Sequence, residues 1–340
     1  MSGIIVGGLV LLLFLLVGWT WIRGTRAKAE LAAKYPPPGQ MVDVGGYRLH
    51  INCQGIPVSG SPTVVMEGGN AESCLTWALV QPEVARFARV CTYDRAGLGW
   101  SERSPQPRTA TNIVEELHTL LTRAGVEPPY VLVGHSIGGM FVRLYAHRYP
   151  DQVTGMVLVD AAHEEQYMRF PTSLQRLQQQ SLTMMAGVMR LLKTLNSMGL
   201  LALFADKIGR TWPTPIPDKV REAYLGVACS DTRFFEAAID ESVSVGENLV
   251  AVRAARIDTL GNLPLVVLSA PDQFANLEKH LSAEDAGQFR VVTEELQAEL
   301  TALSSRGKRV IVRNSGHYIQ VEQPEAVIDA IREVVEAAQR

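Results

Sequence analysis

From Met41 onward the sequence alternates short apolar runs with longer segments of helical periodicity, and this alternation is the strongest constraint on its fold. The short runs have the length and composition of buried strands, at residues 47–53, 63–66, 90–93, 130–133, 156–159, 263–268 and 309–312. Helical patterns lie between several of them, at residues 111–124, 139–148 and 324–338. Strands that alternate with helices form mostly parallel sheets covered on both faces. We therefore expect an α/β domain over residues 41–339.

One long interval, residues 163–257, interrupts this alternation. It is mostly helical in pattern and contains no convincing buried strand. An insertion of this kind between two strands predicts a helical cap over the edge of the sheet. Within it, residues 181–205 are rich in methionine and leucine, but Arg190 and Lys193 near their middle argue against a membrane span. Two interpretations stay open: an apolar helix pair that packs on the body, and a flexible apolar wall for a substrate pocket.

The beginning of the chain predicts a membrane anchor. Residues 3–22 form an uncharged apolar run that as a helix would be about 30 Å long, the thickness of the hydrocarbon core. A cleaved signal peptide is the alternative, but its basic residues should precede the run, whereas here Arg23, Arg26 and Lys28 follow it. Because basic residues beside a span favour the cytoplasmic side, we expect a single-pass membrane protein with a cytoplasmic domain. Residues 23–40 would form the linker.

Composition excludes several classes of protein. A formal net charge of −3 does not fit a general nucleic-acid binder, and a hydrophobic content of 47% is too high for a disordered chain. The four cysteines, Cys53, Cys74, Cys91 and Cys229, show no metal-ligand spacing and are too sparse for a disulfide framework. We expect them to be reduced and buried, which agrees with a cytoplasmic domain.

The most informative segment is YVLVGHSIGG, residues 130–139. An apolar strand leads into the pattern G-x-S-x-G, and a helical pattern begins near Gly139. This context places Ser136 at the tip of a tight turn, where Gly134 and Gly138 let strand and helix approach because they lack a Cβ. The helix N-terminus also presents backbone N–H groups to an oxyanion. We therefore predict that Ser136 is a nucleophile.

A serine hydroxyl needs a neighbouring base to react near pH 7. Among the seven histidines, His317 has the best position, in a glycine-containing loop between the last strand and the C-terminal helix. A late loop at the sheet edge can fold back onto Ser136. His135 adjoins the nucleophile, but neighbours in a tight turn point apart, so it is interpreted as a structural residue. The others are interpreted as surface or packing residues: His50, His118, His147, His163 and His280.

With these motifs the chain resembles serine hydrolases of the α/β-hydrolase fold, in the lineage of bacterial esterases and lipases with a helical cap. The resemblance covers residues 41–339 and includes YDRAGLGWS, residues 93–101, which is similar to the loop after the family's fourth strand. The family's chain order of nucleophile, acid and histidine fits Ser136 first and His317 last. The resemblance implies hydrolysis of a small-molecule or lipid ester through an acyl-enzyme, without a metal or organic cofactor.

The resemblance also implies the oxyanion hole. One N–H belongs to Ile137, the residue after the nucleophile. Glu67 and Gly68 take the positions of the family's frequent His-Gly pair, so Gly69 would supply the second donor.

Two residues are candidates for the acid that orients the histidine. Asp272 lies in the loop after the strand at 263–268, one residue out of register with the family's usual spacing. Asp160 closes the strand at 156–159, a position from which some relatives take the acid. We favour Asp160. Either carboxylate would stabilise the charged imidazole during acyl transfer.

Several functions share this machinery. Serine rather than aspartate at position 136 argues against epoxide hydrolase or haloalkane dehalogenase chemistry. Amidase, thioesterase, C–C hydrolase and acyltransferase activities stay open. So does a catalytically silent member of the fold that serves as a binding protein or scaffold at the membrane. The anchor and the apolar cap also raise the possibility of lipid-directed hydrolysis.

Overall fold

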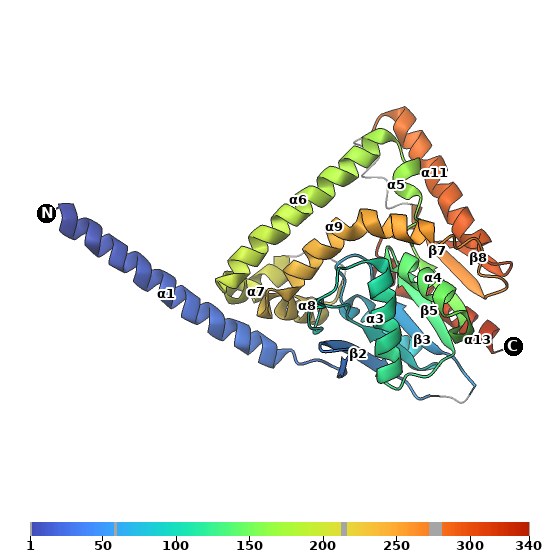
Figure 1. Cartoon of the computed structure of the whole chain (residues 1–340), viewed down its shortest axis with the longest axis horizontal. Helices are drawn as coiled ribbons and strands as arrows, with labels where there is room; N and C mark the ends of the chain where they lie inside the picture. The colour runs from blue at the N-terminus through green and yellow to red at the C-terminus, as the bar shows by residue number, and fades with distance from the viewer. Residues whose placement is uncertain (1, 58–59, 212–215, 272–280, 340) are drawn as a thin grey trace.

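A computed structural model of the chain describes residues 2–57, 60–211, 216–271 and 281–339. At its centre lies an eight-stranded sheet with the order β1-β2-β4-β3-β5-β6-β7-β8 (Figure 1). Strands β3 to β8 pair in parallel, whereas β1 pairs with β2, and β2 with β4, in antiparallel fashion. The strands are β1 Gln40–Asp43, β2 Arg48–Gln54, β3 Thr63–Glu67, β4 Val90–Tyr93, β5 Tyr130–His135, β6 Val153–Val159, β7 Leu265–Ser269 and β8 Gly307–Ile311. The predicted α/β class is confirmed.

Alternate residues of each central strand supply two separate cores. In β3, Val65 belongs to the core beneath α3 and α4, and Val64 belongs to the core beneath α2 and α13. The same alternation holds for Leu132 and Val133 of β5, since successive side chains of a strand point to opposite faces. The helices that cover the two faces are α2 Gln81–Val84, α3 Ala110–Arg123, α4 Gly138–Arg148 and α13 Pro324–Ala338.

The predicted strands and helices are all present, with ends that differ from the expected ones by at most three residues. Two elements were not expected from the sequence. Strand β1 has four residues, two of them polar. Helix α11 (Ala283–Ala302) has buried residues in a narrow stripe that includes Phe289, Leu296 and Leu300. Helix α12 (Ile319–Glu322) follows His317.

The interval between β6 and β7 is helical and forms the cap. Its helices are α5 Gln166–Arg169, α6 Thr172–Ser197, α7 Leu200–Thr211, α8 Asp218–Ser230 and α9 Arg233–Ala254. Helix α9 packs against α3 of the body and against α6 and α8 of the cap. The long α6 forms one outer side of the cap (Figure 1).

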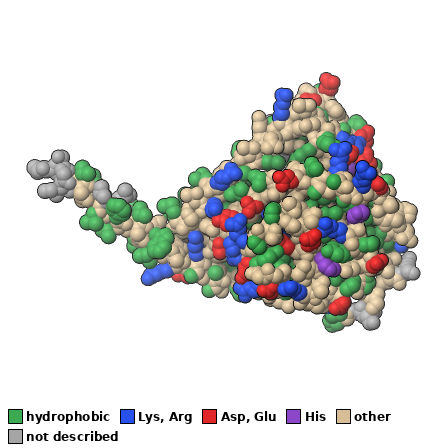
Figure 2. Space-filling view, in the orientation of Figure 1, with side chains coloured by type: hydrophobic (Ala, Val, Ile, Leu, Met, Phe, Trp, Pro, Cys, Tyr) green, Lys and Arg blue, Asp and Glu red, His purple; other side chains and the backbone are tan. Residues whose placement is uncertain are grey.

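Helix α1 (Ser2–Lys34) includes the predicted anchor and most of the predicted linker. The linker prediction for residues 23–40 is wrong for residues 23–34, which are helical and belong to α1. This second half of α1 packs on the cap, where Leu31 is buried with Ala202, Ala205 and Cys229. The apolar half projects freely, with hydrophobic side chains along it and basic side chains near the body (Figure 2). It is the one helix of the described residues that is long and apolar enough to cross a membrane.

Two of the four cysteines form a disulfide, so the expectation of reduced thiols is wrong for Cys53 and Cys91. The antiparallel pairing of β2 with β4 places these residues directly opposite each other, which brings their sulfur atoms within bonding reach. Chain spacing gave no sign of this pairing. Cys74 and Cys229 are free and buried, as expected.

Candidate active site

Ser136 lies in the turn between β5 and α4, where its backbone φ is +54°. A positive φ is uncommon for a residue with a Cβ and requires support from its surroundings. That support depends on close backbone approach: a Cβ on Gly134 would lie 2.7 Å from the carbonyl oxygen of Gly138, and one on Gly138 would lie 2.5 Å from the carbonyl oxygen of Gly68. Only glycine fits at both positions, which explains the spacing of the motif.

The structure brings Ser136, His317 and Asp160 into one hydrogen-bonded chain. The Nε2 atom of His317 lies 3.0 Å from Oγ of Ser136, and its Nδ1 atom lies 2.6 Å from Oδ2 of Asp160. Asp160 follows β6 directly, and its Oδ1 accepts the N–H of Ala270 at 3.1 Å. The other candidate acid, Asp272, lies outside the described residues.

This arrangement favours one tautomer of the neutral His317 imidazole. The Asp160 carboxylate only accepts hydrogen bonds, so it holds the neutral imidazole with its proton on Nδ1. Nε2 is then an acceptor for the Ser136 hydroxyl. The His317 side chain is 37% exposed whereas that of Asp160 is 7% exposed, so the imidazole can reach a substrate while its carboxylate partner stays shielded.

The loop after β3 corrects one predicted site residue. The N–H of Gly69 donates to Oε2 of Glu72 at 2.8 Å and is therefore not free for an oxyanion. Glu72 takes this donor because a buried carboxylate needs hydrogen bonds. Among the described residues, the backbone N–H groups of Ile137 and Asn70 have no acceptor. Asn70 lines the same cavity as Ser136.

Glu72 also forms a buried ion pair with His135. The Nδ1 atom of His135 lies 2.9 Å from Oε1 of Glu72, and its Nε2 atom lies 2.9 Å from the carbonyl oxygen of His317. Burial disfavours the charged imidazole, but Glu72 outweighs burial and raises the pKa of His135. Burial likewise opposes ionisation of Glu72, yet His135 and the Gly69 amide lower its pKa. His135 is therefore more than a turn residue: it links the loop after β3 to the loop that carries His317.

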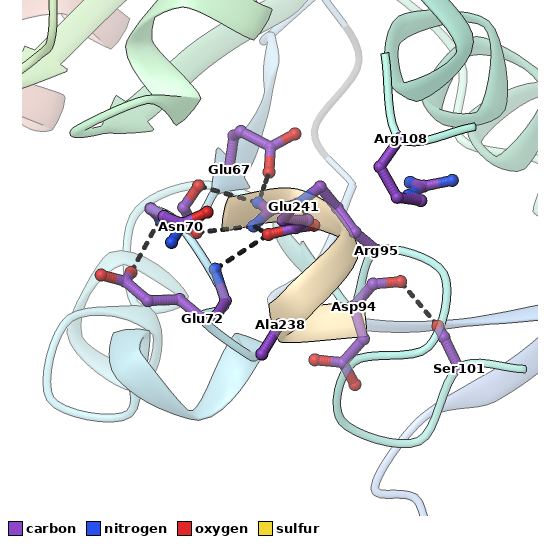
Figure 3. A network of polar contacts seen from close by, with 12 residues as sticks. Glu67, Asn70, Glu72, Asp94, Arg95, Ser101, Arg108, Ala238 and Glu241 are labelled. Atoms are coloured by element: carbon purple, nitrogen blue, oxygen red, sulfur yellow. Dashed lines mark hydrogen bonds and ion pairs between the residues drawn. The ribbon is translucent and has the colours of Figure 1, made fainter. Parts of the chain in front are cut away.

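A second buried network holds the same loop from the cap side (Figure 3). The guanidinium of Arg95 contacts Oε1 of Glu67 at 2.5 Å and both carboxylate oxygens of Glu241 at 2.6 and 2.7 Å. It also donates to the carbonyl oxygens of Gly68 and Gly69 at 2.8 and 2.6 Å. Arg95 belongs to the segment YDRAGLGWS, residues 93–101. Glu241, in α9, had no sequence signal.

Glu241 connects the cap directly to the site. Besides Arg95, its Oε2 accepts the N–H of Ala71 at 2.8 Å. The neighbouring Ser242 accepts a hydrogen bond from the side-chain amide of Asn70 at 3.2 Å. Helix α9 thus holds both residues that follow Gly69, and the position of the loop depends on the cap.

Two cavities meet at Ser136 and His317. The first, of about 380 Å³, is mostly apolar and is lined by Met185, Met189 and Leu192 of α6, Leu201 of α7, and Phe234 and Phe235 of α9. The second, of about 220 Å³, is more polar and includes Gln178, His163, Gln297 and Arg309. Ser136 thus lies between a strongly apolar compartment and a more polar one.

One group of side chains has the composition of a metal site: His50, Cys74 and Asp94 lie close together and are fully buried. Most of their polar atoms are engaged within the protein, although Nε2 of His50 is buried without a hydrogen-bond partner among the described residues. Oδ2 of Asp94 lies 2.8 Å from Nδ1 of His50 and accepts the N–H of Trp100, while Oδ1 accepts the N–H of Cys74. This group therefore braces the loop after β4, and we assign no ion to it.

Comparisons with known proteins agree with this architecture. The sequence model of a family described as alpha/beta hydrolase fold matches residues 62–192. An AB hydrolase superfamily protein of Gibberella zeae is 26% identical over 313 residues, which cover 85% of this chain and 91% of that protein. A probable transporter, efuK of Hormonema carpetanum, is 28% identical over 310 residues, but the chain spans only 42% of its length.

Among solved structures, the chain resembles Cfl2 of Burkholderia cenocepacia with a TM-score of 0.64. The alignment covers 86% of this chain and 94% of that one at 23% identity. At this identity the likeness concerns the fold alone.

Removal of Arg95 should destabilise the fold strongly. The variant Arg95→Met leaves Glu67 and Glu241 buried without their cation, which should lower the free energy of unfolding by about 3–5 kcal/mol. Urea unfolding in detergent, followed by tryptophan fluorescence, measures this change. The control is Lys308→Met, since the pair of Lys308 with Glu333 is exposed and should contribute less than about 1 kcal/mol. Equal losses in both variants would contradict the assigned role of Arg95.

The ion pair of Glu72 with His135 should make stability depend on pH. It is complete while Glu72 is ionised and His135 is protonated. Because the folded pKa of Glu72 is lowered and that of His135 is raised, this condition holds fully between their unfolded values of about 4.3 and 6.5. The stabilisation is lost as pH falls through the folded pKa of Glu72 or rises through that of His135.

The difference in free energy of unfolding between wild type and Glu72→Gln should therefore be largest in this pH window and shrink on either side. Urea titrations across a pH series measure it, with the exposed Glu333→Gln as the control. A difference that is constant with pH would speak against a buried charged pair.

Proposed function

We propose that this chain, which belongs to the α/β-hydrolase family, is a serine hydrolase that cleaves carboxylic esters through an acyl-enzyme on Ser136. The observation that carries the proposal is the hydrogen-bonded chain from Oγ of Ser136 through His317 to Asp160. These contacts support the proposal, because acyl transfer by a serine needs a base beside the hydroxyl and an acid that orients the base.

The reaction would proceed in two halves. Oγ of Ser136 attacks the ester carbonyl carbon while Nε2 of His317 takes its proton, and Asp160 stabilises the resulting imidazolium. The imidazolium then protonates the leaving alcohol, which departs and leaves the acyl group on Ser136. Water, deprotonated by His317, attacks the acyl-enzyme and releases the carboxylic acid.

The backbone N–H groups of Ile137 and Asn70 would hold the oxyanion. Both lack an acceptor among the described residues, and a free backbone donor beside the nucleophile is what the tetrahedral intermediate needs. Asn70 replaces the Gly69 of the sequence prediction, because Glu72 occupies the Gly69 amide. The Glu72 carboxylate and the Arg95 network would keep this loop in place without touching the substrate.

The two cavities favour an amphipathic ester. The acyl chain would occupy the apolar compartment beside α6 and α9, and the more polar alcohol would lie near Arg309 and Gln297. Such a division matches the usual design of ligand pockets, in which apolar walls bind and a few polar groups orient.

A fluorophosphonate probe tests the nucleophile. The full-length protein in detergent should be labelled, and Ser136→Ala should not. The variants His317→Ala and Asp160→Asn should react at least about a hundredfold more slowly than wild type. The first removes the base of the hydroxyl, and the second removes the carboxylate that orients this base. Gel fluorescence over time measures the rates.

Two further variants complete this experiment. His118→Ala, in α3 and stacked on Tyr149, should react like wild type. Asp272→Asn should also do so if Asp160 is the acid. A well-folded wild type that is not labelled would favour the silent binding protein over the hydrolase.

We also propose that α1 anchors the protein in a membrane and that the hydrolase domain lies on the oxidising, non-cytoplasmic side. The expected cytoplasmic location was based on the basic residues after the apolar run and agreed with reduced cysteines, but Cys53 and Cys91 form a disulfide. Disulfides persist in oxidising compartments and are rare in the cytosol. The Cys53–Cys91 bond therefore favours the opposite side.

Labelling of intact cells with a membrane-impermeant maleimide tests this orientation. Ser305 is exposed and Cys74 and Cys229 are buried, so Ser305→Cys supplies the reactive thiol. It should be labelled before the cells are permeabilised, whereas wild type should stay unlabelled. Labelling only after permeabilisation would place the domain in the cytoplasm.

A further inference from the structure

Helix α6 carries an apolar stripe that faces away from the protein. Met184, Val188 and Leu191 are 69%, 47% and 59% exposed, and their spacing of four and three residues places them on one face. Met198, just beyond the end of the helix, is also exposed. Single exposed apolar residues are common, but a contiguous set marks a surface that binds something.

The stripe adjoins the membrane anchor. Gly24, the second residue after the apolar run of α1, lies against Gly199, which follows the end of α6: a Cβ on Gly24 would come within 2.6 Å of the Cα of Gly199. Helix α6 then runs across the direction of α1 rather than along it (Figure 1). If α1 crosses a bilayer, α6 therefore extends along the bilayer surface, at the level where α1 emerges.

The side chains at this level suit a membrane interface. Trp19 and Trp21 are exposed at the end of the apolar run, and the guanidinium of Arg23 lies 5.2 Å from the ring of Trp19. Tryptophan and basic residues concentrate at the boundary between hydrocarbon and headgroups. Arg190 adjoins Leu191 on α6 and is also exposed, which adds a cation that can meet lipid phosphates.

The side of α6 next to this stripe, about 100° around the helix, lines the apolar cavity. Met189 and Leu192 are among its wall residues, and Met185, which is 45% exposed, belongs both to the wall and to the outer surface. A single helix therefore separates the proposed bilayer surface from the cavity that reaches Ser136. Unbranched methionine side chains at this position can move aside for an alkyl chain.

We propose that the outer face of α6 is a second membrane contact, continuous with the anchor, and that lipid esters enter the apolar cavity from the bilayer past Met185. The entry route rests on the proposed function, whereas the contact itself does not. The substrate class that follows is an ester with a long acyl chain, which would leave the bilayer at the surface where α6 lies.

Quenching by nitroxide-labelled lipid tests the contact without requiring turnover. The full-length protein is reconstituted in vesicles of phosphatidylcholine and phosphatidylglycerol, with an environment-sensitive fluorophore on Met184→Cys or Leu191→Cys. Both labels should be quenched by nitroxide near the headgroups. Leu15→Cys, in the apolar run, is the positive control, and Val291→Cys, exposed on α11, is the matched negative control. If only the Leu15 label is quenched, α6 does not touch the membrane and the proposal is overturned.

Turnover tests the entry route. The double variant Met184→Glu/Leu191→Glu should hydrolyse a long-chain fluorogenic ester in the same vesicles about tenfold more slowly, because carboxylates resist burial in lipid. Its rate on a short soluble ester should match wild type. Val291→Glu should leave both rates unchanged.

The outcomes separate the two proposals. Equal rates of the double variant and wild type on the long-chain ester would overturn entry past α6, and so would an equal loss on both esters. A wild type that cleaves neither ester and resists the fluorophosphonate would refute the hydrolase function, while the quenching result would still decide the membrane contact.

Discussion

The buried guanidinium of Arg95 is the interaction on which the site depends most. Its two carboxylate partners come from different parts of the fold, Glu67 from the end of β3 and Glu241 from the cap helix α9. Each charge would be costly in the interior if it lacked its partners. The network therefore forms only when the loop after β4, the loop after β3 and the cap occupy their places together. The cap is thus part of the support of the active site.

The Glu72–His135 pair performs a similar task on the other side of the loop. It ties the Gly69 amide to the strand that precedes Ser136 and, through the carbonyl oxygen of His317, to the loop of the base. Ser136, Asp160 and His317 come from the ends of β5 and β6 and from the loop after β8, and a displacement of any one would break the chain of hydrogen bonds. Buried charge thus fixes the relative positions of loops that the sheet alone would leave independent.

The sequence predicted those features that local pattern determines. Strand and helix positions followed from periodicity. The turn motif and the loop position of His317 predicted its contact with Ser136, and the family resemblance offered Asp160 as the favoured one of two acids, the one that contacts His317 in the structure. Features that depend on pairing across the fold were missed or wrong. Cys53 meets Cys91 only because β2 is antiparallel to β4. Glu241 reaches the site only because α9 packs on the body. The N–H of Gly69 is occupied only because the Glu72 side chain turns back toward it.

The packing of α1 on the cap limits how the domain can move relative to the proposed membrane anchor. A flexible linker would let the domain rotate freely above the bilayer. Here Leu31 is buried with side chains of α7 and α8, and Tyr35 packs against Gly226 and accepts a hydrogen bond from the indole of Trp100. Helix α1 and the domain therefore form one continuous structure. If α1 spans a bilayer, as we propose, this rigid connection sets the orientation of the cap and determines which face of α6 is turned toward the lipid.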